Sequence, residues 1–181
     1  MNQVSEEQRL LEQARNLNSQ VLAKIYDDYS PGVYRYAMRL LGHQELSEEC
    51  VADTFSRFLQ ALRARKGPRE NIQAYLYRIA HNWIVDHYRT EPEETMLDNN
   101  HPGNSLRPED EVIQNLQASR VRKAIRDLTP DQQMVIGMKY LEGLDNNTVA
   151  LALGKPVGAI KSLQHRALAS LKRILENEGL Q

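Results

Sequence analysis

Apolar residues recur at steps of three and four along most of the chain, which is the periodicity of helices rather than of strands. Prolines and glycines divide this pattern into segments. The pattern predicts an all-α fold with helices over residues 5–16, 19–29, 31–41, 45–65, 70–89, 112–127, 130–142, 146–153 and 157–176. A chain of 181 residues has room for one medium domain or two small ones.

Residues 91–111, EPEETMLDNNHPGNSLRPEDE, interrupt the helical pattern. This segment holds three prolines, seven acidic side chains and one basic side chain, and it has too few apolar residues to bury a core of its own. The sequence therefore predicts two small helical domains, residues 1–90 and 112–181, joined by a flexible acidic linker over residues 91–111.

The second domain carries the spacing of a helix-turn-helix. Thr129-Pro130-Asp131-Gln132 forms a capping box with proline at the first helical position, so a helix begins there. Farther on, a small Ala150 allows two helices to approach closely, Gly154 allows a left-handed turn, and Ile160 anchors the second helix inward. A helical hairpin without DNA-binding function could have the same small residues. The second helix, however, leaves a row of polar and basic side chains off its inward face: Lys161, Ser162, His165, Arg166, Lys172 and Arg173.

The distribution of charge supports nucleic-acid binding although the formal net charge is only -1. No acidic residue occurs from residue 54 to 69 or from residue 146 to 175, and each stretch carries five basic side chains. Two basic faces on either side of an acidic connector suggest a polyanion held at two places. On charge alone, two solvated helix faces are the favoured explanation.

The segment IQAYLYRIAHNWIVDHYR, residues 72–89, interleaves aromatic and basic side chains. Single-stranded nucleic acid is bound by such a mixture, because bases stack on rings and phosphates meet charges. Periodicity leaves the alternative open that Trp83 and several tyrosines belong to the core and that Asp86 pairs with Arg89.

Several other classes of protein are disfavoured. The single cysteine, Cys50, excludes an internal disulfide, and no cysteine and histidine cluster suggests a metal site. The longest apolar stretch, Val149 to Leu153, is far too short to span a bilayer, and the acidic start argues against a signal peptide, so a cytoplasmic protein is expected. His81 and His87 lie on different helix faces, and no catalytic motif appears, so no enzyme activity, cofactor or catalytic residue is predicted.

Three segments, in order, resemble the sigma-70 family of RNA polymerase sigma factors, of the small extracytoplasmic-function type. SEECVADTF (47–55) is similar to the helix by which the family binds core polymerase. AYLYRIAHNWIVDHYR (74–89) is similar to the segment that melts and reads the promoter near minus ten. LTPDQQMVIGMKYLEGL and VALALGKPVGAIKS, within residues 128–162, are similar to the domain that binds near minus thirty-five.

The resemblance implies a polymerase subunit that selects promoters and helps to open DNA, with core RNA polymerase, promoter DNA and an anti-sigma factor as partners. It implies two sets of site residues, and the pattern of the second domain adds a third. The set facing core polymerase is Glu48, Glu49, Asp53 and Phe55. The set facing the unwound minus-ten strand is Tyr75, Arg78, Asn82 and Arg89. The charge and helix-turn-helix spacing assign the minus-thirty-five set to Lys155, Lys161, Ser162 and Arg166.

Two rival functions explain less of the chain. A helix-turn-helix regulator with a helical sensor domain accounts for residues 112–176 but not for SEECVADTF. A helical adaptor or anti-sigma protein that binds only protein would have no affinity for promoter DNA in the presence of polymerase.

Overall fold

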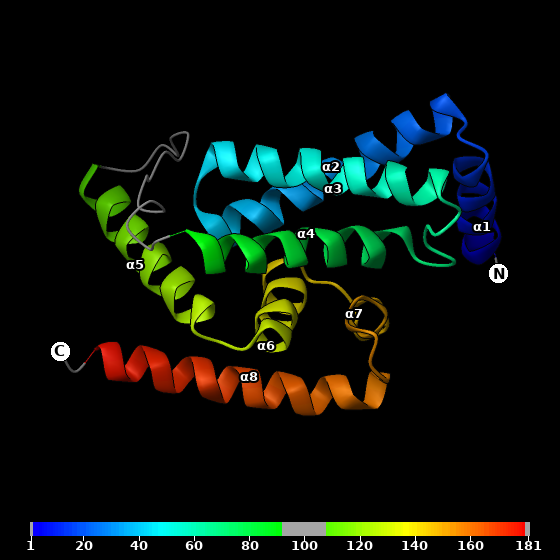
Figure 1. Cartoon of the computed structure of the whole chain (residues 1–181). Coiled ribbons are helices and arrows are strands. Elements are labelled where there is room, and N and C mark those ends of the chain that lie inside the picture. Colours follow the sequence, from blue (N-terminus) through cyan, green and yellow to red (C-terminus); the bar gives the residue numbers. More distant parts are fainter. Residues whose placement is uncertain (1, 92–107, 180–181) are drawn as a thin grey trace.

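The computed structural model of this chain describes residues 2–91 and 108–179 (Figure 1). The described residues fold into helices and turns without a strand, which confirms the all-α prediction. We refer to residues 2–91 as the N-terminal half and to residues 108–179 as the C-terminal half. Most of the predicted linker, residues 92–107, lies outside the described residues.

The N-terminal half consists of four helices: α1 (Asn2–Arg15), α2 (Ser19–Leu41), α3 (Gln44–Arg63) and α4 (Ile72–Thr90). Helix α2 runs through Pro31, where the sequence predicts a break between two helices. Its ends are well capped, since the Asn18 side chain accepts from two backbone amides at the start and Gly42 adopts the left-handed conformation at the end. Buried residues occur on both sides of Pro31, and their packing outweighs the roughly 3 kcal/mol that an internal proline costs.

The C-terminal half begins with α5 (Pro108–Arg126), four residues before the predicted start, so the last part of the predicted linker is helical. Acidic side chains in the first turn of α5 favour this earlier start through the helix dipole. The predicted helix over 130–142 is α6 (Pro130–Val135) continued by a π-helical turn, η2 (Ile136–Leu141). Helices α7 (Asn146–Leu153) and α8 (Val157–Glu178) complete the half.

The local signals in the C-terminal half form as the sequence predicts. Thr129 and Gln132 make the reciprocal capping box. Gly154 ends α7 with φ 63°, and Ile160 is fully buried. The α7 to α8 segment is therefore a helix-turn-helix.

The two halves share one continuous core. Helix α7 packs against α4, and both α5 and η2 pack against α2. Cys50 is a buried free thiol, as expected for a small apolar residue, and burial raises its pKa to about 12. This arrangement places the helix-turn-helix beside the aromatic helix α4.

Candidate nucleic-acid interface

Helix α3 presents an acidic edge. Glu48 and Glu49 are exposed, and the Asp53 carboxylate forms an ion pair with Arg57 at 2.6 Å. Phe55 is only 7% exposed and packs edge-to-face on Tyr26, with ring centroids 4.8 Å apart. Phe55 therefore supports this surface from beneath, and the acidic side chains form the part that a partner can contact.

A hollow of about 270 Å³ lies beside Glu48, between α2 and α3. Its lining includes Tyr26 and Tyr34, neither of which the sequence singles out, and Ala52 forms part of its wall. Tyr26 is 47% exposed. The sequence does not indicate a role for these two tyrosines of α2, because they come next to α3 only when the two helices pack together.

The aromatic residues of α4 divide between core and surface. Tyr77 and His81 are buried, and Tyr88 donates its hydroxyl hydrogen to the Leu40 carbonyl at 2.7 Å. Tyr75 and Trp83 are partly exposed, and Trp83 stacks on His87 with centroids 5.1 Å apart. The periodicity of α4 left core and base-stacking roles open. Tyr75, Trp83 and Tyr88 are the partly exposed rings of this helix, and the Arg126 guanidinium lies over the Tyr88 ring, 5.1 Å from its centroid.

The polar side of α4 carries the remaining minus-ten candidates. Arg78, Asn82 and Arg89 are all exposed. Arg89 lies 3.8 Å from Asp86, the pairing that the sequence alternative anticipates. The Arg78 guanidinium reaches α7, because a Cβ atom placed on Gly154 would lie 3.8 Å from it. Arg78 thus lies where the two halves meet.

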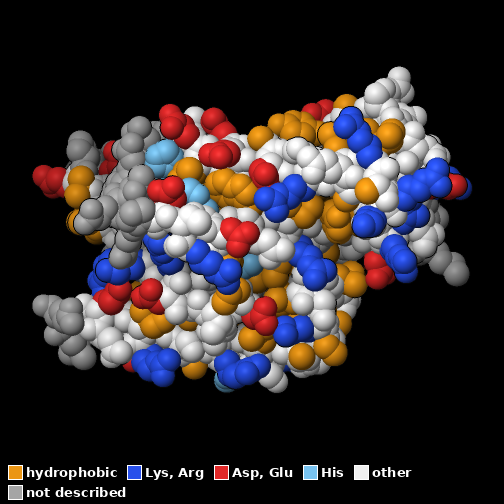
Figure 2. All heavy atoms as spheres, viewed as in Figure 1, with side chains coloured by type: hydrophobic (Ala, Val, Ile, Leu, Met, Phe, Trp, Pro, Cys, Tyr) orange, Lys and Arg blue, Asp and Glu red, His pale blue; other side chains and the backbone are white. Residues whose placement is uncertain are grey.

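Residues 64–71, between α3 and α4, extend this polar surface. Arg65, Lys66 and Arg69 are exposed in this segment, and Asn71 caps α4 by accepting from the Ala74 amide at 2.8 Å. Figure 2 shows Lys and Arg side chains gathered at the end of the molecule where α1 and this segment lie. The first acid-free stretch of the sequence also contacts Tyr75, through Phe58, whose ring centroid is 6.1 Å from that of Tyr75.

The helix-turn-helix leaves the start of α8 exposed. Lys161, Ser162 and Arg166 are exposed on α8, while Leu163 is only 7% exposed. Lys155, in the turn, forms an ion pair with Asp131 at 3.1 Å, with both side chains partly exposed. The structure thus places these four candidates on one helix-turn-helix unit and gives Lys155 an internal partner that the sequence did not indicate.

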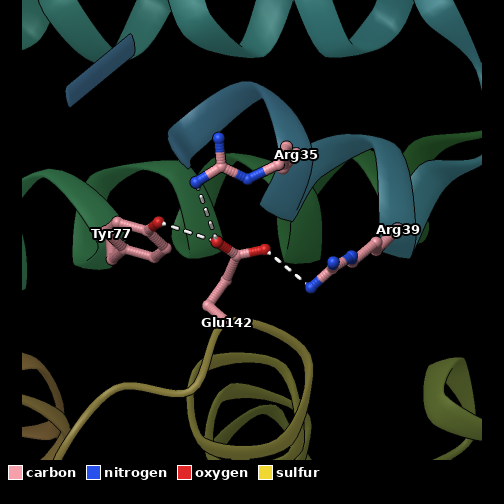
Figure 3. Close-up of polar contacts among 4 residues, drawn as sticks. All are labelled: Arg35, Arg39, Tyr77 and Glu142. Carbon is pink, nitrogen blue, oxygen red and sulfur yellow. Dashed lines mark hydrogen bonds and ion pairs between the residues drawn. The ribbon is translucent and has the colours of Figure 1, made fainter. Parts of the chain in front are cut away.

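A buried carboxylate joins the two halves. Glu142, directly after η2, is 4% exposed and faces three side chains of the N-terminal half (Figure 3). Arg39 lies 3.0 Å away, Arg35 lies 3.8 Å away, and the Tyr77 hydroxyl donates a hydrogen bond at 3.2 Å. Burial, reinforced by the Glu142 charge, raises the pKa of Tyr77, so this phenol stays protonated and remains a donor.

A second buried contact lies between α4 and α6. His81 Nε2 is 2.9 Å from the Pro130 carbonyl oxygen, and Nδ1 is 2.7 Å from the Tyr36 hydroxyl. A carbonyl only accepts, so Nε2 carries the proton and Nδ1 of the neutral ring accepts from Tyr36. Tyr36 also packs on Gly137, where an added Cβ would lie 2.6 Å from the ring, so only glycine allows this approach.

This contact predicts that stability depends on pH. Burial lowers the pKa of His81 from 6.5 to about 4. The stability due to neutral His81 is therefore complete above pH 6.5 and is lost as the pH falls from 6.5 towards 4. Between pH 7.5 and 5.5 the free energy of unfolding should fall by about 1 kcal/mol because of this residue. Urea unfolding of wild type and His81→Gln at both pH values measures the effect, and equal pH dependence in the two proteins would contradict it.

No helix in the described ranges, 2–91 and 108–179, has the length and apolar character needed to cross a membrane.

The comparisons with known proteins cover both halves. Residues 25–92 match the family described as Sigma-70 region 2, and residues 118–171 match Sigma-70, region 4. ECF RNA polymerase sigma factor BldN of Streptomyces coelicolor is 34% identical over 176 residues, covering 94% of this chain and 66% of BldN. ECF RNA polymerase sigma factor SigL of Mycobacterium tuberculosis is 26% identical over 164 residues, covering 88% of this chain and 92% of SigL.

Solved structures have the same fold. CnrH, in complex with the cytosolic domain of CnrY, superposes with a TM-score of 0.68 at 23% identity, over 94% of this chain and 97% of that one. The sigma factor RpoE, in complex with the anti-sigma factor NepR from Bartonella quintana, gives a TM-score of 0.55 at 21% identity, over 87% of this chain and 96% of that one.

Proposed function

Because the chain belongs to the sigma-70 family of RNA polymerase sigma factors, and within it to the extracytoplasmic-function type, we propose that it directs core polymerase to specific promoters and helps to open them. One observation carries this proposal. An aromatic and basic helix, α4, and a helix-turn-helix occur in one chain, in the order of regions 2 and 4. In this role the protein binds and positions DNA and catalyses no reaction of its own.

The N-terminal half would bind core polymerase and the unwound minus-ten strand. The acidic edge of α3, with Glu48, Glu49 and Asp53, faces the polymerase, and Phe55 holds this edge in shape from below. Tyr75 on α4 offers a ring to an unstacked base, and the base contacts offset the few kcal/mol that unstacking costs. Arg78, Asn82 and Arg89 provide hydrogen-bond donors along the same strand.

The C-terminal half would bind the minus-thirty-five element through α8. Lys161 and Ser162 lie in the second turn of the helix, within reach of base edges in the major groove, while Arg166 and Lys155 meet phosphates. The proposed domains are residues 1–90 for region 2 and 112–181 for region 4, with 91–111 between them.

This function requires the two halves to separate. The two promoter elements are about 25 base pairs apart, which is about 85 Å of B-form DNA. A compact chain of this length has a radius of gyration of about 16 Å and is roughly 40 Å across. With the halves in contact, α4 and α8 cannot both reach their elements, so the contacts of Glu142 and His81 must break when the polymerase complex forms.

An anti-sigma factor is the proposed regulatory partner, and the cytoplasm the proposed compartment. Among the fold neighbours, RpoE forms a complex with the anti-sigma factor NepR, and CnrH forms one with the cytosolic domain of CnrY. The acidic edge of α3 and the contact region between the halves are the surfaces that an inhibitor would cover to block both polymerase and promoter.

Run-off transcription tests the proposed function. Core polymerase with this protein is expected to start transcription at discrete sites on a fragment library of the source genome, and core polymerase alone is not. Absence of new start sites would refute the sigma-factor function. Promoter binding without transcription would indicate a helix-turn-helix regulator instead.

The recognition helix gives a separate prediction. Lys161→Ala or Ser162→Ala should reduce the free energy of DNA binding by about 1 to 3 kcal/mol, because each removes a base contact. The preference for the upstream element should also become weaker. Arg166→Ala should weaken binding to all sequences alike. It should also lower the slope of log affinity against log salt concentration by about one unit. Binding titrations of holoenzyme at several salt concentrations measure both effects. A changed sequence preference with an unchanged salt slope for Arg166→Ala would contradict the assignment.

Leu163 is the matched control on the same helix. Leu163 is buried, so Leu163→Ala should leave a cavity that lowers the free energy of unfolding by about 2 to 5 kcal/mol. The melting temperature should fall accordingly. Weakened DNA binding with unchanged stability would show that Leu163 faces the DNA.

A further inference from the structure

Helix α1 contacts the segment that precedes α4, although α1 lies outside the residues matched to region 2. Figure 1 shows α1 beside the turn that leads from α3 to α4. Two of its side chains bond to backbone groups here, one within this segment and one at the first residue of α4. The Arg15 guanidinium donates to the Pro68 carbonyl at 2.9 Å. The Glu7 carboxylate accepts from the Ile72 amide at 3.1 Å.

The segment makes two sharp turns, one at the end of α3 and one at the start of α4. Arg65 has a φ of 56° and closes α3, with the Lys66 amide donating to the Ala61 carbonyl at 2.8 Å. Asn71 has a φ of 49° and caps α4. Pro68 is buried between these two residues, and its carbonyl is the one that Arg15 holds. Glu7 contacts the residue that follows this segment, Ile72, at the start of α4.

The anchoring of α1 makes it a rigid support. Leu11 is 1% exposed and Ala14 is fully buried, so one face of the helix is packed into the core. The bonds to Pro68 and Ile72 add a specific constraint, since they place one carbonyl of residues 64–71 and the first amide of α4 relative to α1.

We propose that α1 is a brace for minus-ten recognition, in which Glu7 and Arg15 act as positioning residues that hold residues 64–71 beside Tyr75 of α4. This rests on the proposed function. In the braced conformation Arg65, Lys66 and Arg69 meet backbone phosphates on the strand whose bases stack on α4. Without these two bonds, residues 64–71 are no longer held in a single conformation. The phosphates that they bind then no longer determine which bases lie against α4.

The test uses the complete chain with core polymerase, on the strongest promoter found by the run-off experiment. Two further templates carry substitutions in its minus-ten or its minus-thirty-five element. For Glu7→Ala with Arg15→Ala, the preference for the original minus-ten element is expected to fall about fivefold or more, which is the lower end of the loss for a base contact. The preference for the original minus-thirty-five element should stay at the wild-type value.

Matched variants separate positioning from folding. Glu7→Gln with Arg15→Lys keeps an acceptor and a donor and should restore the minus-ten preference. Arg9→Ala with Glu12→Ala changes two exposed side chains of the same helix and should have no effect. The affinity for core polymerase, measured by gel filtration or fluorescence, should be the same in all variants.

Three results would overturn the brace. The first is a wild-type minus-ten preference in the double alanine variant. The second is a parallel loss of both element preferences and of polymerase affinity, which indicates general unfolding. The third is failure of the conservative variant to restore the preference. If the wild-type protein gives no start sites at all, the proposed function fails instead, so the two failures are distinct.

Discussion

The Glu142→Lys variant is expected to lose the contact between the two halves while keeping its helices. The substitution would put an ammonium group at a site that is 4% exposed, against the guanidinium groups of Arg35 and Arg39. Replacing one partner of a buried ion pair costs about 3 to 5 kcal/mol. The two arginines are 58% and 46% exposed, so the lower end, about 3 kcal/mol, applies here.

Small-angle scattering measures this opening. The radius of gyration should rise above the value of about 16 Å for a compact chain, while the helical circular dichroism stays unchanged. Glu176→Lys is the matched control, because it makes the same charge change in an exposed pair with Lys172 on α8. An unchanged radius for Glu142→Lys would show that the other contacts hold the halves together without this carboxylate.

Gly137→Ala should open the same contact by a different mechanism. The added methyl carbon would lie 2.6 Å from the Tyr36 ring, which is buried and has no room to move. Overpacking of this kind lowers the free energy of unfolding by about 1 to 3 kcal/mol. A smaller increase in radius than for Glu142→Lys is therefore expected from the same scattering measurement.

Reversing two charges on α3, Glu49→Lys with Asp53→Lys, is expected to abolish association with core polymerase. Glu49 is exposed, and the Asp53 side chain is about one-third exposed, so both carboxylates can face a partner. Removing charge partners at an interface costs about 2 to 5 kcal/mol, and reversal adds repulsion, so the affinity should fall by about 100-fold or more. Co-purification and a fluorescence titration with core polymerase measure the loss.

The matched control reverses two acids elsewhere on the surface, Glu176→Lys with Glu178→Lys in the last turns of α8. Helical content should be unchanged in both double variants, although Asp53→Lys also removes the pair with Arg57 and brings two positive charges one turn apart. Undiminished binding of the α3 variant would refute the assignment of this edge to core polymerase.

The sequence by itself determined the features that depend on neighbours a few residues away. Thr129 and Gln132 cap α6 because the bonds of a capping box join residues three apart. Gly154 ends α7 because a left-handed turn needs a residue without a Cβ. The spacing of Ala150, Gly154 and Ile160 was therefore enough to predict the helix-turn-helix, and the same periodicity predicted the inward position of Leu163.

Local signals placed the candidate residues on their helices but did not show which of them the fold would bury. Phe55, Tyr77 and His81 are buried because they face α2 or the C-terminal half, whereas Tyr75 on the next face of α4 remains partly exposed. Periodicity identifies the faces of a helix, and the burial of each face depends on the helices packed against it. Pro31 likewise lies inside α2, because contacts on both sides outweigh its local preference.

Only the tertiary structure decided how the two halves meet. Glu142 and Arg39 are 103 residues apart in the chain, and nothing in the sequence around either residue indicates the other. Their pairing depends on the approach of η2 to α2, which in turn needs Gly137 against Tyr36. The contacts of Glu7 and Arg15 with the turn before α4 span 65 and 53 residues. Such contacts depend on shape and charge matching between distant surfaces, and residue order along one helix carries no record of that matching.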